Sequence, residues 1–187
     1  MKKILILLIL MAQLSACSSL PEQSSEMTRL NADTWVKLPA PGLQESFARH
    51  QLLSVETEAG RQSFQALLTV HQQQMELLAL TPSGIRLFSL RYDEQGINIE
   101  QHIHHEHLPP AVQVLSDVML AYWPQNNWHE VLPQGWMLEN LAEQRRLLDA
   151  LGNPVVEIDY RLENNHREPY RLIHHHFGYQ LHIRNLD

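Results

Sequence analysis

Short segments in which apolar and polar residues alternate follow one another through the first half of the chain. Such alternation predicts strands with one buried face. The segments are residues 47–57, 62–71, 74–80, 85–92 and 97–103. Turn residues separate them, as in the Pro82 to Gly84 stretch. Strands joined by short turns pair antiparallel, so the sequence predicts a five-stranded meander that curls toward an incomplete barrel.

A different period begins after Pro109 and Pro110. Apolar residues then recur three and four positions apart, which predicts an amphipathic helix that Pro124 stops. Its apolar stripe contains Val112, Leu115, Met119 and Tyr122. The other face carries Gln113, Ser116 and Asp117, which we expect to meet solvent. The stripe predicts a helical lid over the mouth of the curled sheet.

The segment of residues 136–154 has two interpretations. Its composition favours a helix, but Gly152 and Asn153 form a turn signal and a strand-like run follows them. A hairpin across this turn is the competing prediction. The end of the chain predicts two strands around Phe177 and Gly178.

The N-terminus predicts export and a lipid anchor. Two lysines and an apolar run make residues 1–16 a signal peptide. Residues 14–17, Leu-Ser-Ala-Cys, resemble the bacterial lipobox, in which the cysteine, here Cys17, carries the lipid. A plain secreted protein with a chance cysteine is the alternative, but an exposed free thiol is a liability in an oxidising compartment. Ser18 after the cysteine favours sorting to the outer membrane of a Gram-negative bacterium, on its periplasmic face.

Composition then divides the mature chain. Residues 17–41 are rich in Ser, Glu, Pro and Ala and predict a flexible tether, which leaves residues 42–187 as one domain. The formal charge of −7 becomes −9 once Lys2 and Lys3 are removed. An acidic surface argues against nucleic acid as a partner.

The order of these elements resembles the LolA/LolB fold, and specifically LolB-like outer-membrane lipoproteins. The local match is "LLALTPSGIRLFSL", residues 77–90, which is similar to the family's strand, Pro-Gly turn and strand. "GNPVVEIDYR", residues 152–161, resembles a later hairpin of the family and favours strands over 143–161. The plan also resembles a group of small lipoproteins encoded beside aryl-polyene-type lipid synthesis genes. One departure is Ser83, where LolB has an exposed apolar residue thought to aid lipoprotein insertion.

The resemblance implies a mainly β fold with a helical lid, a hydrophobic cavity and no catalysis. Its cargo would be an acyl chain, a polyene or a lipoprotein, with a LolA-like periplasmic protein as a possible donor. We expect the cavity to be lined by Phe64, Leu68, Val70, Leu77, Val112, Leu115, Met119 and Tyr122. The alternative is a docking lipoprotein of an envelope assembly, whose core is filled. A ligand-sized void would favour the carrier.

Histidines suggest a metal at first sight. His102, His104, His105 and His107 lie within six residues, and His174 to His176 form a second run. Zinc needs three or four converging ligands, whereas the alternation places His102 and His104 on the solvated face of a strand. We therefore expect no metal and no cofactor. Trp123, Trp128 and Trp136 flank the expected lid, and packing is favoured for them over ligand contact.

Overall fold

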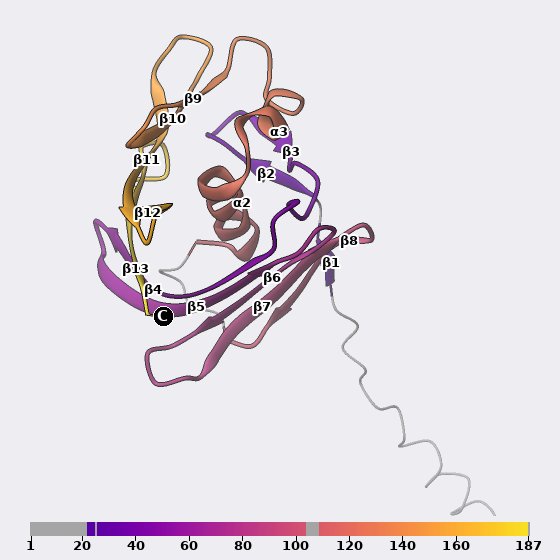
Figure 1. The fold of residues 1–187 in the computed structure, drawn as a ribbon, viewed down its shortest axis with the longest axis vertical. Coiled ribbons are helices and arrows are strands. Elements are labelled where there is room, and N and C mark those ends of the chain that lie inside the picture. The colour runs from indigo at the N-terminus through magenta and orange to yellow at the C-terminus, as the bar shows by residue number, and fades with distance from the viewer. Residues whose placement is uncertain (1–21, 25, 104–108, 187) are drawn as a thin grey trace, which may run out of the picture.

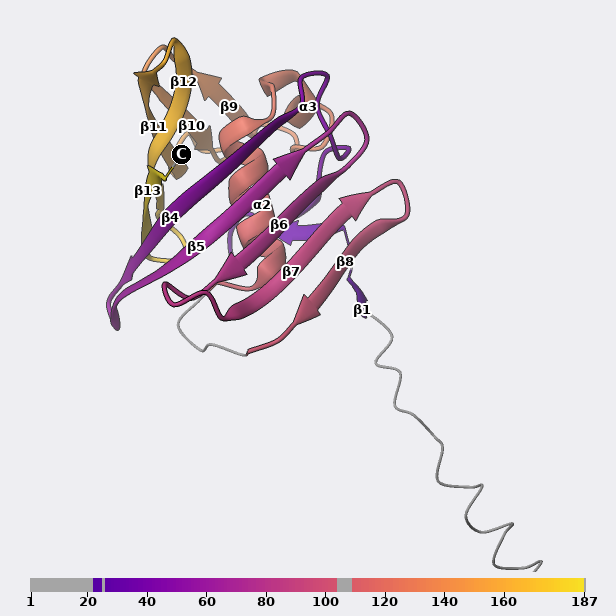
Figure 2. The same ribbon diagram turned by 60° about the horizontal axis from the view of Figure 1, so that its bottom comes forward.

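The computed structural model describes residues 22–24, 26–103 and 109–186, and its main feature is one large antiparallel sheet. Eleven strands follow the order β1-β8-β7-β6-β5-β4-β13-β12-β11-β10-β9. Their bounds are β1(Glu22–Ser24), β4(Phe47–Thr57), β5(Gly60–Val70), β6(Met75–Leu80), β7(Arg86–Asp93), β8(Gly96–Gln101), β9(Met137–Asn140), β10(Gln144–Leu148), β11(Pro154–Glu163), β12(His166–His174) and β13(Tyr179–Asn185). Among these strands, β1 and β9 each pair on one side only, so the sheet is open. It bends around a central helix, as Figures 1 and 2 show.

Most of the predicted elements are confirmed. The five segments of the meander are β4 to β8, and each pairs antiparallel with the next. The hairpin across Gly152 and Asn153 is β10 and β11, and the last two predicted strands are β12 and β13. The last strand, β13, pairs antiparallel with β4, so the C-terminal strands and the meander form one continuous sheet. Alternation and turn signals therefore predicted β4 to β8 and β11 to β13, the family resemblance favoured a strand at β10, and β1 and β9 were not predicted.

The helix α2(Ala111–Tyr122) lies within the curve of the sheet (Figure 1). Its stripe packs inward as predicted, with Leu115 and Met119 fully buried. The face expected to meet solvent is buried too, since Gln113, Ser116 and Asp117 are at most 8% exposed. The prediction of a lid is therefore corrected. A lid would keep its polar face in solvent, whereas α2 lies inside the curve of the sheet and has its polar face buried as well.

The N-terminal strap, residues 26–41, crosses the side of α2 that the sheet leaves open. It contains β2(Met27–Arg29) and β3(Trp35–Lys37), which pair with each other in a separate two-stranded sheet. Leu30, Val36 and Leu38 are buried in the core. The expected tether through residue 41 therefore ends earlier, because an apolar residue every few positions draws this segment onto the helix. Residues 17–21 lie outside the described residues, as does the predicted signal peptide.

Polar contacts fix the strap and the helix end. Tyr92 Oη donates to the carbonyl of Pro39 at 3.0 Å, and Trp123 Nε1 donates to that of Ala40 at 3.0 Å. Gly42 has φ +82°, and a Cβ there would lie 2.3 Å from the backbone oxygen of Gln72. Only glycine allows this close approach, which pins the end of the strap to the β5–β6 turn.

The short helix α3(Gln125–His129) follows Pro124 and places Trp128 under α2, where its Nε1 donates to the carbonyl of Met119 at 3.3 Å. Trp123 and Trp128 are fully buried, in agreement with packing. None of the helices in the described parts of the chain is both long and apolar enough to cross a membrane.

Candidate functional site

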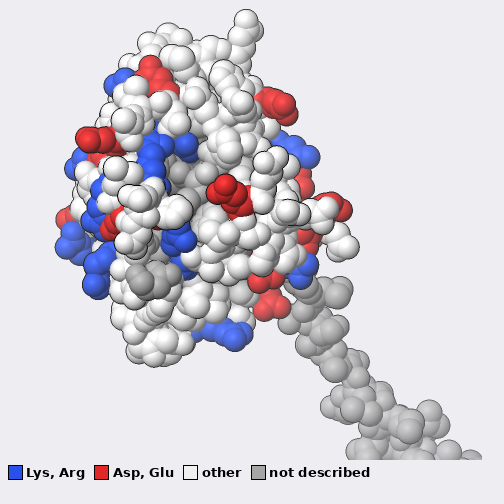
Figure 3. Space-filling view, viewed as in Figure 1, with Lys and Arg blue, Asp and Glu red and all other residues white. Residues whose placement is uncertain are grey.

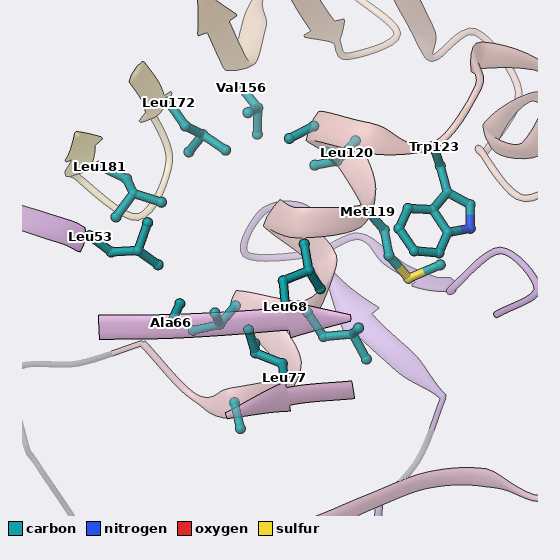
Figure 4. Close-up of a cluster of buried hydrophobic side chains, with 14 of the residues drawn as sticks. Leu53, Ala66, Leu68, Leu77, Met119, Leu120, Trp123, Val156, Leu172 and Leu181 are labelled. Atoms are coloured by element: carbon teal, nitrogen blue, oxygen red, sulfur yellow. The ribbon is translucent and has the colours of Figure 1, made fainter. Parts of the chain in front are cut away.

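The interior of the sheet has two walls of different character. The N-terminal wall is the inner face of β5 to β8, and the C-terminal wall is the inner face of β10 to β13. Cross-strand pairs make each wall continuous: Leu68 lies opposite Leu77, and Leu172 lies opposite Leu181. Figure 4 shows Leu53, Leu172 and Leu181 pointing from the sheet toward the helix. Strand β4 joins the walls through Leu53, which lies opposite Phe64 on one side and Ile183 on the other.

The N-terminal wall is closed. Leu68 is 1% exposed, Leu77 2% and Met75 0%. No buried residue of β5 to β8 is charged or carries an amide, hydroxyl or imidazole other than Tyr92, within the residues that the structure describes. Water therefore does not reach this side, and its side chains serve as ordinary core.

The C-terminal wall keeps accessible surface along one strand. Tyr179, Leu181 and Ile183 alternate on the inner face of β13 and are 7–8% exposed. Neighbouring helix residues Val114 and Ala121 also keep a little exposure, and Val118 and Tyr122 are only partly buried. From Tyr179 to Ile183 the strand advances by four residues, about 13 Å, so β13 offers an apolar band of that length beside α2.

Buried polar groups interrupt this wall. Tyr179 Oη donates to Asp117 Oδ2 at 2.5 Å, and Gln113 Nε2 donates to Asp117 Oδ1 at 3.2 Å. Burial raises the pKa of Asp117 to about 7, although both hydrogen bonds oppose the change. Burial, followed by the neighbouring Asp117 carboxylate, raises the pKa of Tyr179 well above its ordinary value. The pair keeps the Tyr179 proton and couples the helix to β13.

A buried arginine holds the other end of the helix. Arg145 on β10 donates through Nη1 to the carbonyls of Leu120 at 2.7 Å and Trp123 at 2.9 Å. Tyr160 Oη donates to the carbonyl of Ala121 at 2.7 Å. The C-terminus of a helix carries partial negative charge, so the guanidinium is compensated by backbone dipoles. Burial lowers the pKa of Arg145 nonetheless.

The band along β13 has an aromatic and basic end at the β12–β13 turn. His174 is 1% exposed, and its ring lies 4.3 Å from the Phe177 ring and 5.3 Å from the Tyr179 ring, centroid to centroid. Arg29 of the strap lies over the same Phe177 ring, with Cζ 5.9 Å from the centroid. Burial, with smaller contributions from His176 and His175, lowers the pKa of His174 to about 3, so this imidazole is neutral.

At its other end the band meets a surface pocket of about 570 Å³. Phe47 and Tyr122 form its aromatic side, with ring centroids 5.1 Å apart. Its polar side is a network around the buried Glu168, which pairs with Arg49 and accepts from Tyr122 Oη at 3.4 Å. Gln51 Nε2 donates to Tyr122 Oη and to Asn185 Oδ1. The volume is within the range of small-molecule pockets, about 300–1,000 Å³.

The residues expected to line a cavity are divided by the structure. Phe64, Leu68, Val70 and Leu77 lie in the closed N-terminal wall. Leu115 and Met119 are buried on α2, while Val112 and Tyr122 are partly buried against the core. Of these eight, Tyr122 lines the pocket beside β13. A ligand cavity among all eight remains a prediction.

The sequence did not point to β13, Asp117, His174 or Arg29 as parts of a site. The alternation of Tyr179, Leu181 and Ile183 was visible in the sequence, but their residual exposure depends on how the helix lies against them. Arg29 fell in the expected tether. Only the clustered histidines gave a signal, and it suggested metal rather than a hydrogen-bond donor.

The described residues contain no group of three His, Cys, Asp or Glu side chains placed to hold a metal ion. His102 is exposed at the end of β8, as its place on the solvated face predicted. His104, His105 and His107 lie outside the described residues, and so does Cys17.

Comparison with known proteins gives a family. No curated protein matches the chain. A family model with the description "Protein of unknown function (DUF3261)" matches residues 48–187, from the second residue of β4 to the C-terminus. Since the match spans 140 of the 187 residues, the chain belongs to the DUF3261 family.

Proposed function

We propose that the protein is a LolB-like outer-membrane lipoprotein, anchored through Cys17, that binds an acyl-type hydrophobic ligand without catalysis. The observation that carries the proposal is the band of β13, whose apolar side chains keep 7–8% exposure inside an open curved sheet, with a pocket of about 570 Å³ beside the end of the same strand at Asn185. The sequence resemblance to the LolA/LolB fold supports the same function.

The chemistry of the band suits a chain-like ligand. Leu181, Ile183 and Val114 offer aliphatic surface without hydrogen-bonding groups. Binding would draw on burial of apolar area, about 25 cal/mol per Å². An acyl chain, a polyene or the lipid of a lipoprotein would each present such area, and a LolA-like protein could deliver it.

The proposal does not include insertion of lipoproteins into the membrane. Ser83 lies exposed in the β6–β7 turn, and its hydroxyl is 2.9 Å from that of Thr81. A hydroxyl held in this way offers no apolar contact to a membrane. The proposal therefore concerns holding a ligand.

A docking lipoprotein is the second candidate, because one edge of the sheet is open and apolar. The edge strand β9 exposes Met137, and Leu141 follows it. Leu151, at the tip of the β10–β11 hairpin, is 87% exposed. Such an edge can receive a strand from a partner.

Native mass spectrometry of the mature protein, released gently from membranes, tests the two candidates. A carrier is expected to show additional mass beyond the N-terminal lipid, and this mass should disappear on solvent extraction and return when a fatty acid is added. A docking lipoprotein is expected to show the lipidated chain alone and no saturable uptake of fatty acid, which would overturn the carrier.

The anchor needs a separate measurement. Cys17→Ala should abolish incorporation of labelled palmitate and release the protein from the membrane fraction, whereas Ser18→Ala should keep both. A Cys17→Ala protein that still carries label in the membrane pellet would contradict the anchor.

A further inference from the structure

Two hydrogen-bond donors without a protein acceptor belong to side chains that pack against the ring of Phe177. They are Nε of Arg29, on the strap, and Nε2 of His174, at the end of β12; both atoms are buried, and neither has a partner among the described residues. Buried donors are nearly always paired in folded proteins. Two that lie beside the same ring therefore suggest an acceptor that comes from outside the chain.

The hydrogen bonds that are present fix the chemistry of both atoms. His174 Nδ1 accepts the backbone N–H of Phe177 at 3.4 Å. The ring proton of the neutral imidazole is therefore on Nε2, which makes this atom a donor. Arg29 Nη2 donates to the carbonyl of Ala32 at 2.8 Å, which holds the guanidinium in place. Its Nε–H can only donate, since arginine has no acceptor.

Arg29 also brings a positive charge that no carboxylate neutralises within the described part of the chain. Its Cζ lies 5.5 Å from the Trp35 ring centroid and 5.9 Å from that of Phe177, so two aromatic faces hold it. Across the turn, His175 pairs with Glu157 at 2.7 Å. The two buried carboxylates among the described residues are both occupied, Asp117 by Tyr179 and Gln113, and Glu168 by Arg49.

Figure 3 shows that lysine and arginine gather on the side of the molecule where β10 to β13 lie. Those four strands carry Arg145, Arg146, Arg161, Arg167, Arg171 and Arg184. Arg146, Arg161 and Arg171 form ion pairs with Glu139, Glu163 and Asp159, so much of this charge is neutralised locally and Arg29 supplies the charge beside Phe177.

We propose that Arg29 and His174 form a head-group site for a single carboxylate, so that the ligand is a free fatty acid. The carboxylate would accept from Arg29 Nε and His174 Nε2 beside Phe177. The chain would lie along Tyr179, Leu181 and Ile183 toward the pocket at Tyr122. This inference rests on the proposed function and narrows it from hydrophobic ligands to those with one anionic head.

The strap gives the site a way to open. Strands β2 and β3 pair only with each other among the described strands, so side chains hold the middle of the strap over α2. Its end is pinned at Pro39 to Gly42. Moving the β2–β3 hairpin would separate Arg29 from His174 and uncover the start of the band.

The experiment compares a fluorescent fatty acid with the matched fatty alcohol, by titration of the mature, delipidated full domain with its strap. Wild type should bind the acid at least tenfold more tightly than the alcohol. Arg29→Gln and His174→Leu should each lower affinity for the acid about tenfold and leave the alcohol unchanged. Arg29→Lys, which keeps the charge, should recover part of the loss, and Arg61→Gln at the exposed β4–β5 turn is the matched control.

The outcomes separate this inference from the proposed function. Equal binding of acid and alcohol by wild type, or equal loss of both in Arg29→Gln, would overturn the head-group site and leave the carrier. Binding of neither probe by wild type would overturn the carrier itself. If Arg29→Gln does not fold, as circular dichroism would show, His174→Leu and the wild-type preference for the acid decide the inference.

Discussion

The two walls of the sheet face the same helix but differ in their polar content and in how completely they are buried. The N-terminal wall packs Leu68, Leu77 and Met75 against α2 with almost no exposed surface. The C-terminal wall places Arg145, His174 and Tyr179 among aliphatic residues and leaves β13 partly accessible. A wall of aliphatic residues alone secures stability, whereas polar groups in a core are costly unless paired. Buried polar groups that stability alone does not require are therefore concentrated in the C-terminal wall, and this is the wall in which we place the function.

The largest test of the comparison is Arg145→Met. The change removes the bonds from Nη1 to the carbonyls of Leu120 and Trp123 and leaves those carbonyls buried. We expect the free energy of unfolding to fall by about 4 kcal/mol, because each lost charged hydrogen bond is worth about 1.5–3 kcal/mol. Urea unfolding measures it. Arg146→Met, which removes a partly exposed pair with Glu139, should cost under about 1 kcal/mol; equal losses would show that Arg145 does not hold the helix.

A second test asks whether both walls depend on the strap. Leu30 belongs to the strap and is fully buried in the core, so Leu30→Ala should lower the free energy of unfolding by about 3 kcal/mol, within the usual range for such truncations. Thermal and urea melts give the value. Leu151→Ala at an exposed hairpin tip should change stability by less than about 0.5 kcal/mol. A neutral Leu30→Ala would mean that the strap does not cover the core in solution.

Matched tryptophan substitutions compare the walls directly. Leu68→Trp should cost about 1–3 kcal/mol, because a closed core resists added volume. Leu181→Trp, in the accessible band, should cost less than half as much and should lower fatty-acid affinity. Thermal melts and probe titration on the same preparations give both quantities. Equal destabilisation with no change in binding would remove the distinction between the walls.

The smallest expected effect concerns Asp117 and pH. Its folded pKa of about 7 lies above the ordinary value of 3.8, so the folded state binds more protons than the unfolded state between these values. This group therefore stabilises the fold most at low pH, and its contribution is lost as pH rises through about 7. Asp117→Asn should remove that slope and change the difference in unfolding free energy between pH 6 and pH 7 by about 1 kcal/mol. Parallel wild-type and Asp117→Asn curves would contradict it.

Periodicity predicted the sheet better than the site. Period-two alternation identified β4 to β8 and β13, because each of these strands has one buried face. It missed β9, which has four residues and a helix-like composition around it. It also read the polar face of α2 as exposed, since a sequence cannot show that a sheet and a strap enclose a helix from several sides.

The site depended on contacts between distant segments. Arg29 and Phe177 are 148 residues apart and meet only because the strap crosses α2. Asp117 was polar and was therefore assigned to solvent, although Tyr179 satisfies it inside. Residual exposure of a few per cent along β13 is a property of packing that composition does not encode.

The first strand of the sheet has a consequence for the proposed anchor. The sheet already holds the chain at β1, so only five residue steps separate Cys17 from Glu22, and they span at most about 18 Å when fully extended. A tether through residue 41 would have reached more than twice as far. Because the linker is this short, the effective concentration of the bilayer at the ligand site is high, on the order of millimolar. A site attached in this way can exchange ligand with the membrane at an affinity too weak to extract it from dilute solution.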